Sequence, residues 1–232
     1  MLTVVIPTLN EAKRLPRCLE SLSNQTLKDF EVFVVDSVSK DGTADIARKW
    51  GAKVLCEPML GVSIAKNTGA SKVKSDVLVF TDADTTSPPD WLEKISKHFE
   101  DEKVVCVFGA IRPNDGNALD RFVFYVSSDL FPKIAHVFGF MIAHGPNIAF
   151  RRKVFVESGG YDERLTILED NELPNRVRNY GKVVFDSSIW VYASARRFQE
   201  EGHLRPFLRF MKGYWDLYVR KIHAKVEYPP IR

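Results

Sequence analysis

The chain has 232 residues, of which 45% are hydrophobic, 27% are charged and 12% are aromatic. This composition is typical of a globular protein with a buried core, and it excludes disordered, collagen-like and disulfide-stapled chains. The net charge of +3 is too small to indicate a nucleic-acid partner, although residues 196–232 carry nine basic against four acidic side chains.

Short apolar, β-branched runs alternate with helical segments in the first half of the chain. The predicted strands cover residues 2–7, 30–36, 53–57, 77–82 and 104–110, and the predicted helices cover residues 15–24, 43–50, 62–73 and 91–100. This alternation favours an α/β fold with a mostly parallel sheet and helices on both faces. Ligands gather at the carboxyl ends of the strands in such sheets, where Asp36 and Asp82 stand.

The regular alternation ends after residue 110. Residues 119–141 are apolar and aromatic, which indicates a helix broken at residues 129–132. We expect its aromatic side chains in the core, with an acceptor groove as the alternative. Residues 204–222 have apolar side chains at helical spacing, and we expect this helix to pack on the domain, with a basic membrane-contacting helix as the alternative. Further short strands are predicted at residues 148–151, 183–186 and 190–191.

The cysteines and the apolar segments indicate in which cellular compartment the chain is expected. Cys18, Cys56 and Cys106 show neither a metal-binding spacing nor a disulfide framework, which is typical of a reducing compartment. The first residues lack the basic and apolar segments of a signal peptide, and no stretch is apolar enough to span a membrane. We therefore expect a cytoplasmic chain, with peripheral contact at the inner face of the membrane left open.

An apolar run leads directly into two carboxylates, Asp82 and Asp84. Alternate residues of a strand point to the same side, and two neighbouring anions need a cation, a proton or solvent. One or two carboxylates together with substrate phosphate oxygens are the usual ligands of Mg²⁺. A solvated acidic turn is the alternative, but the position after a fully apolar strand favours the metal site. Neither a phosphate-binding P-loop nor a G-x-G-x-x-G motif is present, which excludes P-loop phosphoryl transfer and dinucleotide redox chemistry.

A second acidic cluster contains Glu169 and Asp170. An acid near a metal-bound diphosphate can act as general base toward an incoming hydroxyl. The same residues also suit the start of a helix, where carboxylates are stabilised by capping and by the helix dipole. The spacing alone leaves both interpretations open. His144 and His203 are expected to be structural.

Several motifs, in the same order and spacing, resemble an inverting family 2 glycosyltransferase of the GT-A fold. They are VVIPTLNE at residues 4–11, FVVDSVSKDGT at 33–43, GVSIAKNTG at 61–69, DAD at 82–84, GPN at 145–147, GGYD at 159–162 and ED at 169–170. The match covers about residues 2–200. It implies a mostly parallel sheet flanked by helices, with an acceptor-side extension at the C-terminal end.

The sequence shows no internal repeat, low-complexity tract or flexible linker, so we expect one catalytic domain over residues 1–232. Residues 1–110 would bind the nucleotide sugar, and residues 111–200 would contribute the acceptor and catalytic half. Residues 201–232 would form an amphipathic, basic C-terminal helix. The alternatives are a phosphatase of the haloacid-dehalogenase type that uses Asp82 as nucleophile, and a non-catalytic domain that binds a nucleotide sugar or a membrane.

The resemblance also implies roles for single side chains. Asp170 matches the catalytic base and Glu169 flanks it. Asp84 would be the principal ligand of Mg²⁺ or Mn²⁺, with Asp82 near the metal and the ribose. The expected nucleotide-sugar-binding residues are Pro7, Thr8, Asn10, Glu11, Asp36, Lys66, Asn67, Asp82, Ala83, Asn147, Arg196 and Arg197.

The implied reaction moves one sugar from a nucleoside diphosphate, UDP as the first expectation and GDP as the second, to an acceptor glycan or a lipid-linked phosphate. A single displacement with inversion needs no covalent nucleophile. Residues 196–198 read RRF where processive members carry Q-x-x-R-W, so transfer of a single sugar is expected. Lys66 replaces the arginine that the family often has, and a point charge replaces a planar fork.

Overall fold

The structure is a computed structural model that describes residues 1–202, 204–218 and 220, with the side chains of residues 197–199 left out. His203, the side chain of Arg197 and residues 221–232 of the expected basic tail therefore lie outside the described residues.

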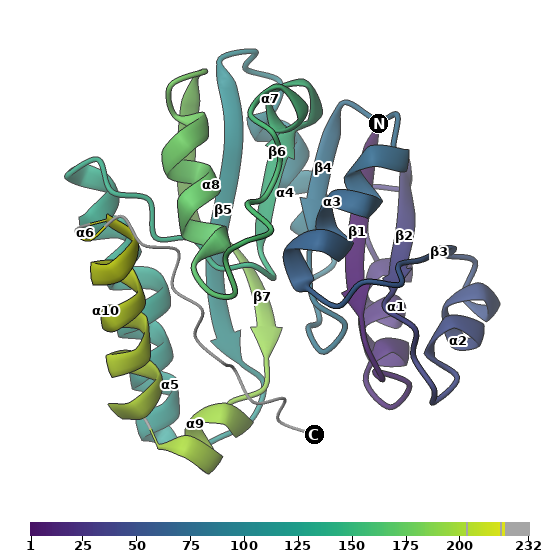
Figure 1. Cartoon of the computed structure of the whole chain (residues 1–232), viewed down its shortest axis with the longest axis horizontal. Coiled ribbons are helices and arrows are strands. Elements are labelled where there is room, and N and C mark those ends of the chain that lie inside the picture. The colour runs from purple at the N-terminus through teal and green to yellow at the C-terminus, as the bar shows by residue number, and fades with distance from the viewer. Residues whose placement is uncertain (203, 219, 221–232) are drawn as a thin grey trace.

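A seven-stranded sheet with the order β3-β2-β1-β4-β6-β5-β7 organises the fold (Figure 1). The strands are β1 (Leu2–Thr8), β2 (Phe30–Asp36), β3 (Lys53–Cys56), β4 (Val77–Phe80), β5 (Val104–Pro113), β6 (Ile148–Arg151) and β7 (Lys182–Ala193). Only β6 runs antiparallel to its neighbours β4 and β5 among these described strands. The predicted mostly parallel sheet is confirmed.

Helices cover both faces of the sheet, because neighbouring residues of each buried strand point to opposite sides. Val4 and Ile6 of β1 pack with α1, α2 and α4, whereas Val5 packs with α3, α7 and α8. These helices are α1 (Leu15–Ser23), α2 (Thr43–Lys49), α3 (Val62–Lys72), α4 (Trp91–His98), α7 (Arg152–Glu157) and α8 (Glu169–Val177). The two clusters form one core on each side of the sheet, so α3 and α8 share a face.

The strand β7 is continuous where the sequence predicts two short strands. Its register against β5 shifts at Gly109, where the partner changes from Asp186 to Trp190. The carbonyl oxygen of Ile189 comes so close to Gly109 that a Cβ there would lie 2.0 Å from it. A bulge over a glycine therefore interrupts the alternating pattern without ending the strand.

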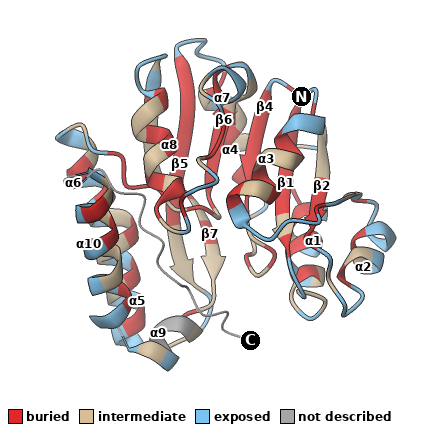
Figure 2. Cartoon of the chain, in the orientation of Figure 1, coloured by how far each residue is buried: buried red, intermediate tan, exposed pale blue. Residues whose placement is uncertain are grey.

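Residues 118–137 form three consecutive helical segments, α5 (Ala118–Phe124), the π-helix η1 (Tyr125–Leu130) and α6 (Phe131–Val137). The expected break near Pro132 is absent because this proline stands at the first turn of α6, where its missing N–H costs nothing. The expectation of core aromatics is wrong for Phe122, Tyr125 and Phe131, which are exposed, while Phe124 is buried. Figure 2 shows much of this helical layer in the exposed colour.

The chain ends its described part in α9 (Arg196–Glu201) and α10 (Leu204–Tyr218). α10 packs on the domain as expected, but its buried residues are Pro206, Gly213 and Asp216, and its apolar stripe is exposed. A Cβ on Gly213 would lie 2.5 Å from the side chain of Ile167, which indicates that α10 packs through its small residues. Within the described ranges, no helix has the length and apolarity needed to cross a membrane.

Candidate active site

The loops after β1 and β2 interlock at the carboxyl edge of the sheet. The Thr8 hydroxyl donates to Asp36 Oδ1 at 3.1 Å, and the backbone N–H of Ser39 donates to Asp36 Oδ2 at 3.0 Å. Asn10, in a left-handed conformation with φ 57°, accepts a hydrogen bond from the Lys40 backbone at 2.9 Å. The structure therefore brings three predicted donor-binding residues to one edge, with Pro7 half-buried at the end of β1.

The two carboxylates after β4 lie in a turn, because the strand ends at Phe80, earlier than the sequence predicts. The Thr85 hydroxyl closes this turn by donating to the Asp82 carbonyl at 2.7 Å, so the expectation that strand alternation orients the two carboxylates is wrong. Ala83 between them is buried in the core, so its side chain does not face the edge.

Two cations stand beside these carboxylates. Arg196 Nη2 lies 3.6 Å from Asp84 Oδ2. Burial raises the pKa of Asp82 to about 7, with Lys66 opposing the rise and Asp84 adding to it. Burial also raises the pKa of Glu11, although Arg14 opposes it. A desolvated carboxylate with a raised pKa is one that lacks sufficient positive charge around it.

The donor set fits a divalent ion that is shared with a substrate. No three His, Cys, Asp or Glu side chains converge on one point in the part of the chain that the structure describes. Magnesium is usually bound by one or two protein carboxylates, with waters and phosphate oxygens completing its shell. The oxygen ligands of Asp82 and Asp84 suit that mode of binding, whereas a closed protein cage for the metal is absent from the described residues.

The side chain of Lys66 lies at the centre of the acidic residues. It is buried on α3, and its Nζ donates to Asp170 Oδ1 at 2.8 Å and lies 3.7 Å from Glu169 Oε1. The same ammonium lies 4.9 Å from the ring centre of Tyr161. Burial lowers the pKa of Lys66, but Asp170, Glu169 and Asp82 outweigh it and raise the pKa overall. Lys66 is therefore a fixed cation in this cluster.

The acidic pair opens α8, which begins at Glu169 after Leu168 in a left-handed conformation. Burial, reinforced by Asp170, raises the pKa of Glu169 to about 8, so Glu169 is mostly protonated at neutral pH. Asp170 is partly open, with 18% of its side chain exposed. Of the two neighbouring carboxyl groups, Asp170 is the one that reaches the surface.

The loop that contains Gly145 closes over Asp170. A Cβ at Gly145 would lie 2.2 Å from Asp170 Oδ2, so only glycine fits there. Burial lowers the pKa of the neighbouring His144 to about 4, and its Nε2 has no hydrogen-bond partner among the described residues. His144 is therefore neutral beside the carboxylate.

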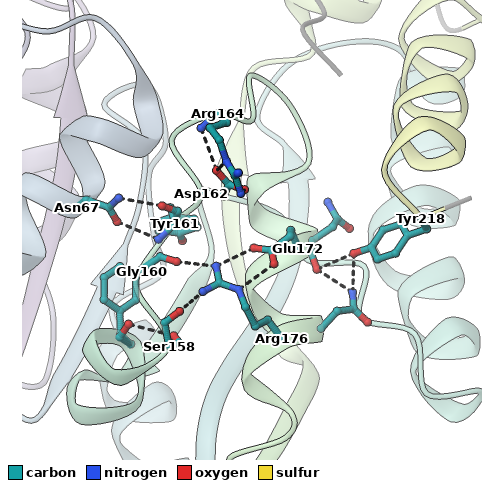
Figure 3. A network of polar contacts seen from close by, with 12 residues as sticks. Asn67, Ser158, Gly160, Tyr161, Asp162, Arg164, Glu172, Arg176 and Tyr218 are labelled. Carbon is teal, nitrogen blue, oxygen red and sulfur yellow. Dashed lines mark hydrogen bonds and ion pairs between the residues drawn. The ribbon is translucent and has the colours of Figure 1, made fainter. Parts of the chain in front are cut away.

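Two predicted donor-binding amides are used inside the protein. Asn147 donates to the carbonyl oxygens of Ala110 and Ile189 at 2.8 and 3.0 Å and accepts from Trp91 at 2.9 Å. Asn67 donates to the Tyr161 carbonyl and accepts from the Tyr161 N–H, both at 2.9 Å (Figure 3). Both amides position the loops around the acidic residues.

A polar network holds α8 from two sides (Figure 3). Arg176 pairs with Glu172 at 2.8 Å and donates to the Gly160 carbonyl at 2.6 Å, which fixes the GGYD loop to the helix. On the other side, Asn175 donates to the Tyr218 hydroxyl of α10 at 3.1 Å, and that hydroxyl donates to the Asn171 carbonyl at 3.2 Å. The helix that carries Asp170 is thus bound to α10.

Sequence reasoning missed two features of this site. The pair of Lys66 with Asp170 joins residues 104 positions apart, and no local pattern signals it. The contact of Arg196 with Asp84 was equally invisible, although a double arginine was singled out. The side chain of Arg197 lies outside the described residues.

Comparisons with known proteins bear on this arrangement. The model of the family "Glycosyl transferase family 2" matches residues 3–159. The glycosyltransferase AglE of Haloferax volcanii is 29% identical over 174 residues, which are 70% of this chain and 56% of AglE. The PGL/p-HBAD biosynthesis glycosyltransferase of Mycobacterium tuberculosis is 32% identical over 179 residues, 73% of this chain and 66% of that protein.

A solved structure is also similar. The mannosyltransferase PcManGT of Pyrobaculum calidifontis, in complex with GDP-Man and Mn²⁺, superposes with a TM-score of 0.71 at 25% identity. The alignment covers 91% of this chain and 64% of PcManGT. The chain thus spans between 56% and 66% of the length of these three proteins. With a family match over more than half of its residues and the same GT-A sheet, the chain belongs to glycosyltransferase family 2.

Proposed function

We propose that this chain transfers one sugar from a nucleoside-diphosphate sugar to an acceptor hydroxyl or phosphate, with inversion, in a single non-processive step. Asp170 is the general base, and Asp84 with Asp82 holds Mg²⁺ or Mn²⁺. The observation that carries the proposal is the meeting of α3, α8 and the turn after β4, which gathers Asp82, Lys66 and Asp170 in one electrostatic cluster.

The protein's own groups divide the work between donor and acceptor. Asp84 and Asp82 would hold the ion, which would supply positive charge against the diphosphate leaving group. Arg196, beside Asp84, adds a second positive charge at the same place. Thr8, Asn10 and Asp36 form the nucleoside side of the edge.

Asp170 takes the proton of the acceptor. Its partner Lys66 holds the carboxylate in place through the 2.8 Å contact, and burial raises the pKa of the neighbouring Glu169, which reduces the competing negative charge. General-base assistance of this kind contributes about 10²–10⁴-fold to a rate. Attack from the side opposite the leaving group inverts the anomeric centre without a covalent enzyme intermediate.

The identities of the donor and the acceptor are inferred from the comparisons and from the family resemblance. PcManGT, bound to GDP-Man, supports GDP-sugars as donors, and UDP-sugars remain the expectation from the family resemblance. The acceptor class is a glycan or a lipid-linked phosphate. We place the whole reaction in one catalytic domain, residues 1–110 serving the donor and residues 111–200 the acceptor, in the cytoplasm.

The test compares Asp170→Asn with Asp84→Ala and the surface control Asp90→Asn, after a thermal-shift screen of GDP- and UDP-sugars with Mn²⁺. We expect Asp170→Asn to fold and bind donor but to lose about 10²–10⁴-fold in transfer. Asp84→Ala loses metal-dependent donor binding, and Asp90→Asn changes neither.

Each competing function gives a different result. Full transfer by Asp170→Asn removes it as the base, and a product with retained anomeric configuration excludes inversion. Release of phosphate from small esters with a phosphoryl group on Asp82 indicates the phosphatase. Donor binding without turnover by the unaltered chain indicates a non-catalytic domain.

A further inference from the structure

We infer that the end of the chain built by α5, η1, α6 and α10 binds the surface of an anionic lipid bilayer. This inference goes beyond the proposed reaction and does not depend on it. We call these helices, with the turn after α6, the apolar end. Its exposed large apolar residues are Leu119, Phe122, Tyr125, Leu130, Phe131, Ile134, Val137, Phe138, Phe140, Leu204, Phe207, Leu208, Met211, Trp215 and Tyr218.

The exposure of this surface is unusually high for apolar side chains. Val137 is 80% exposed, Phe138 is 74% exposed and Leu204 is 67% exposed. Scattered apolar residues on a surface need no explanation, but a cluster of this extent marks a contact site.

The apolar end is one region of the molecule. Figure 1 shows α5, α6 and α10 at the same end of its longest axis, with α2 at the opposite end. Asn175 of α8 connects the two parts, because its side chain donates both to the Met141 carbonyl after α6, at 2.9 Å, and to the Tyr218 hydroxyl of α10. The small residues of α10 face inward, so its apolar stripe is left on the outside.

The basic and the acidic residues on these helices differ in how exposed they are. Every exposed charged residue within α5, η1, α6 and α10 is basic, namely Arg121, Lys133, Arg205 and Lys212. The acidic residues of the same elements are withdrawn, since Asp120 and Asp216 are buried and Asp129 is half-buried. An apolar surface whose exposed charges are all positive complements anionic headgroups above an acyl layer.

The same difference argues against a second copy of the chain as the partner. A two-fold contact brings the same patch of two protomers together, so the four cations would face their own copies without an acidic partner. Like charges in juxtaposition oppose such an interface. A bilayer that contains acidic lipids meets the same cations with opposite charge.

The location adds a reason for this contact. The Tyr218 hydroxyl of α10 donates to the Asn171 carbonyl in the first turn of α8, next to Asp170. The backbone of Ser127 in η1 interacts with His144, which neighbours the glycine that lies over Asp170. α10 also packs on the residues that lead into the acidic pair, since a Cβ on Gly213 would lie 2.5 Å from Ile167. A lipid surface on the outer face of α10 therefore lies across this helix from the candidate base.

The test uses the full chain without donor and vesicles of phosphatidylcholine, alone or with one quarter phosphatidylglycerol, in a sedimentation assay. We expect binding to the anionic vesicles that weakens about tenfold or more when salt rises from about 0.05 to 0.5 M, because headgroup attraction is screened. Trp215→Glu and the double variant Arg205→Glu/Lys212→Glu each reduce binding about tenfold. Trp50→Glu, an exposed tryptophan after α2 at the opposite end, leaves it unchanged.

Tryptophan fluorescence distinguishes insertion of the apolar end into the bilayer from adsorption of the chain on the bilayer surface. A blue shift on anionic vesicles is expected for the unaltered chain and for Trp50→Phe, and it is lost in Trp215→Phe. Three results overturn the inference: no binding to anionic vesicles, an equal loss in Trp50→Glu and Trp215→Glu, or a lipid-free dimer in sedimentation equilibrium that Trp215→Glu dissociates. Because no step uses a sugar donor, failure here leaves the proposed transfer untouched.

Discussion

Replacing Lys66 by methionine removes the buried cation of the acidic cluster while nearly preserving its side-chain length. With an effective dielectric constant of about 20, the attraction to Asp170 at 2.8 Å is about 6 kcal/mol, and that to an ionised Glu169 at 3.7 Å is about 4.5 kcal/mol. Burial raises the pKa of Glu169 and so weakens its negative charge at neutral pH, which leaves the first pair dominant. The desolvation of the ammonium offsets part of this energy.

The net effect is therefore smaller than the Coulomb energy. Breaking a buried ion pair by removing one partner costs about 3–5 kcal/mol, since the other charge stays behind uncompensated. We expect Lys66→Met to lower the free energy of unfolding by that amount. For a chain of this length the corresponding fall in melting temperature is about 6–20 °C.

The assay is urea denaturation at pH 7.5 without nucleotide or metal. Lys53→Met is the matched control, because Lys53 also pairs with a carboxylate, Glu31 at 2.6 Å, and lies 5.3 Å from the Phe33 ring centre. Its side chain is 57% exposed, so water screens the pair. We expect a loss of no more than about 1 kcal/mol there.

A double-mutant cycle tests the assigned partner. In Lys66→Met/Asp170→Asn no unpaired charge remains at Asp170, so the double variant should be more stable than the sum of the single losses predicts. Equal losses for Lys66→Met and Lys53→Met, or strict additivity in the cycle, would refute the reasoning.

Two further predictions concern the neighbours of Asp170. Gly145→Ala places a methyl group 2.2 Å from Asp170 Oδ2, so we expect a loss of stability of about 1–3 kcal/mol and a fall in transfer rate, measured by melting and initial rates; unchanged rates would show that the loop moves freely. The raised pKa of Glu169 makes the folded state bind more protons than the unfolded state between about pH 4.5 and 8, so stability from this group falls as pH rises through that window. Glu169→Gln should flatten the fall of the urea midpoint between pH 6 and 8.5, and an unaltered slope would contradict the shift.

The central sheet could be predicted closely because its strands are buried on both faces and read as continuous β-branched runs. The strand at residues 30–36 was predicted with the bounds that β2 has. β7 could not be predicted as one strand, because the bulge at Ile189 depends on a carbonyl lying over Gly109 of another strand.

The candidate site was only partly visible in the sequence. Acidic residues after strands can be recognised, since chain direction places strand ends at one edge. The position of Lys66 could not, because its contact with Asp170 depends on how α3 and α8 pack on the same face of the sheet. The close approach of Gly145 to Asp170 has the same tertiary origin.

The helices at the apolar end show a limit of what hydrophobic periodicity in a sequence can predict. An apolar stripe indicates that one face of a helix is shielded from water, but it does not indicate whether protein or lipid covers that face. In α10 the helix packs through Pro206 and Gly213 and leaves Trp215 outside, so close backbone approach at a glycine decided its orientation. The withdrawal of acidic Asp216 beneath that helix, while Lys212 stays exposed, follows the same orientation. The sign of the exposed charges, which only the structure reveals, is what separates a lipid surface from a core.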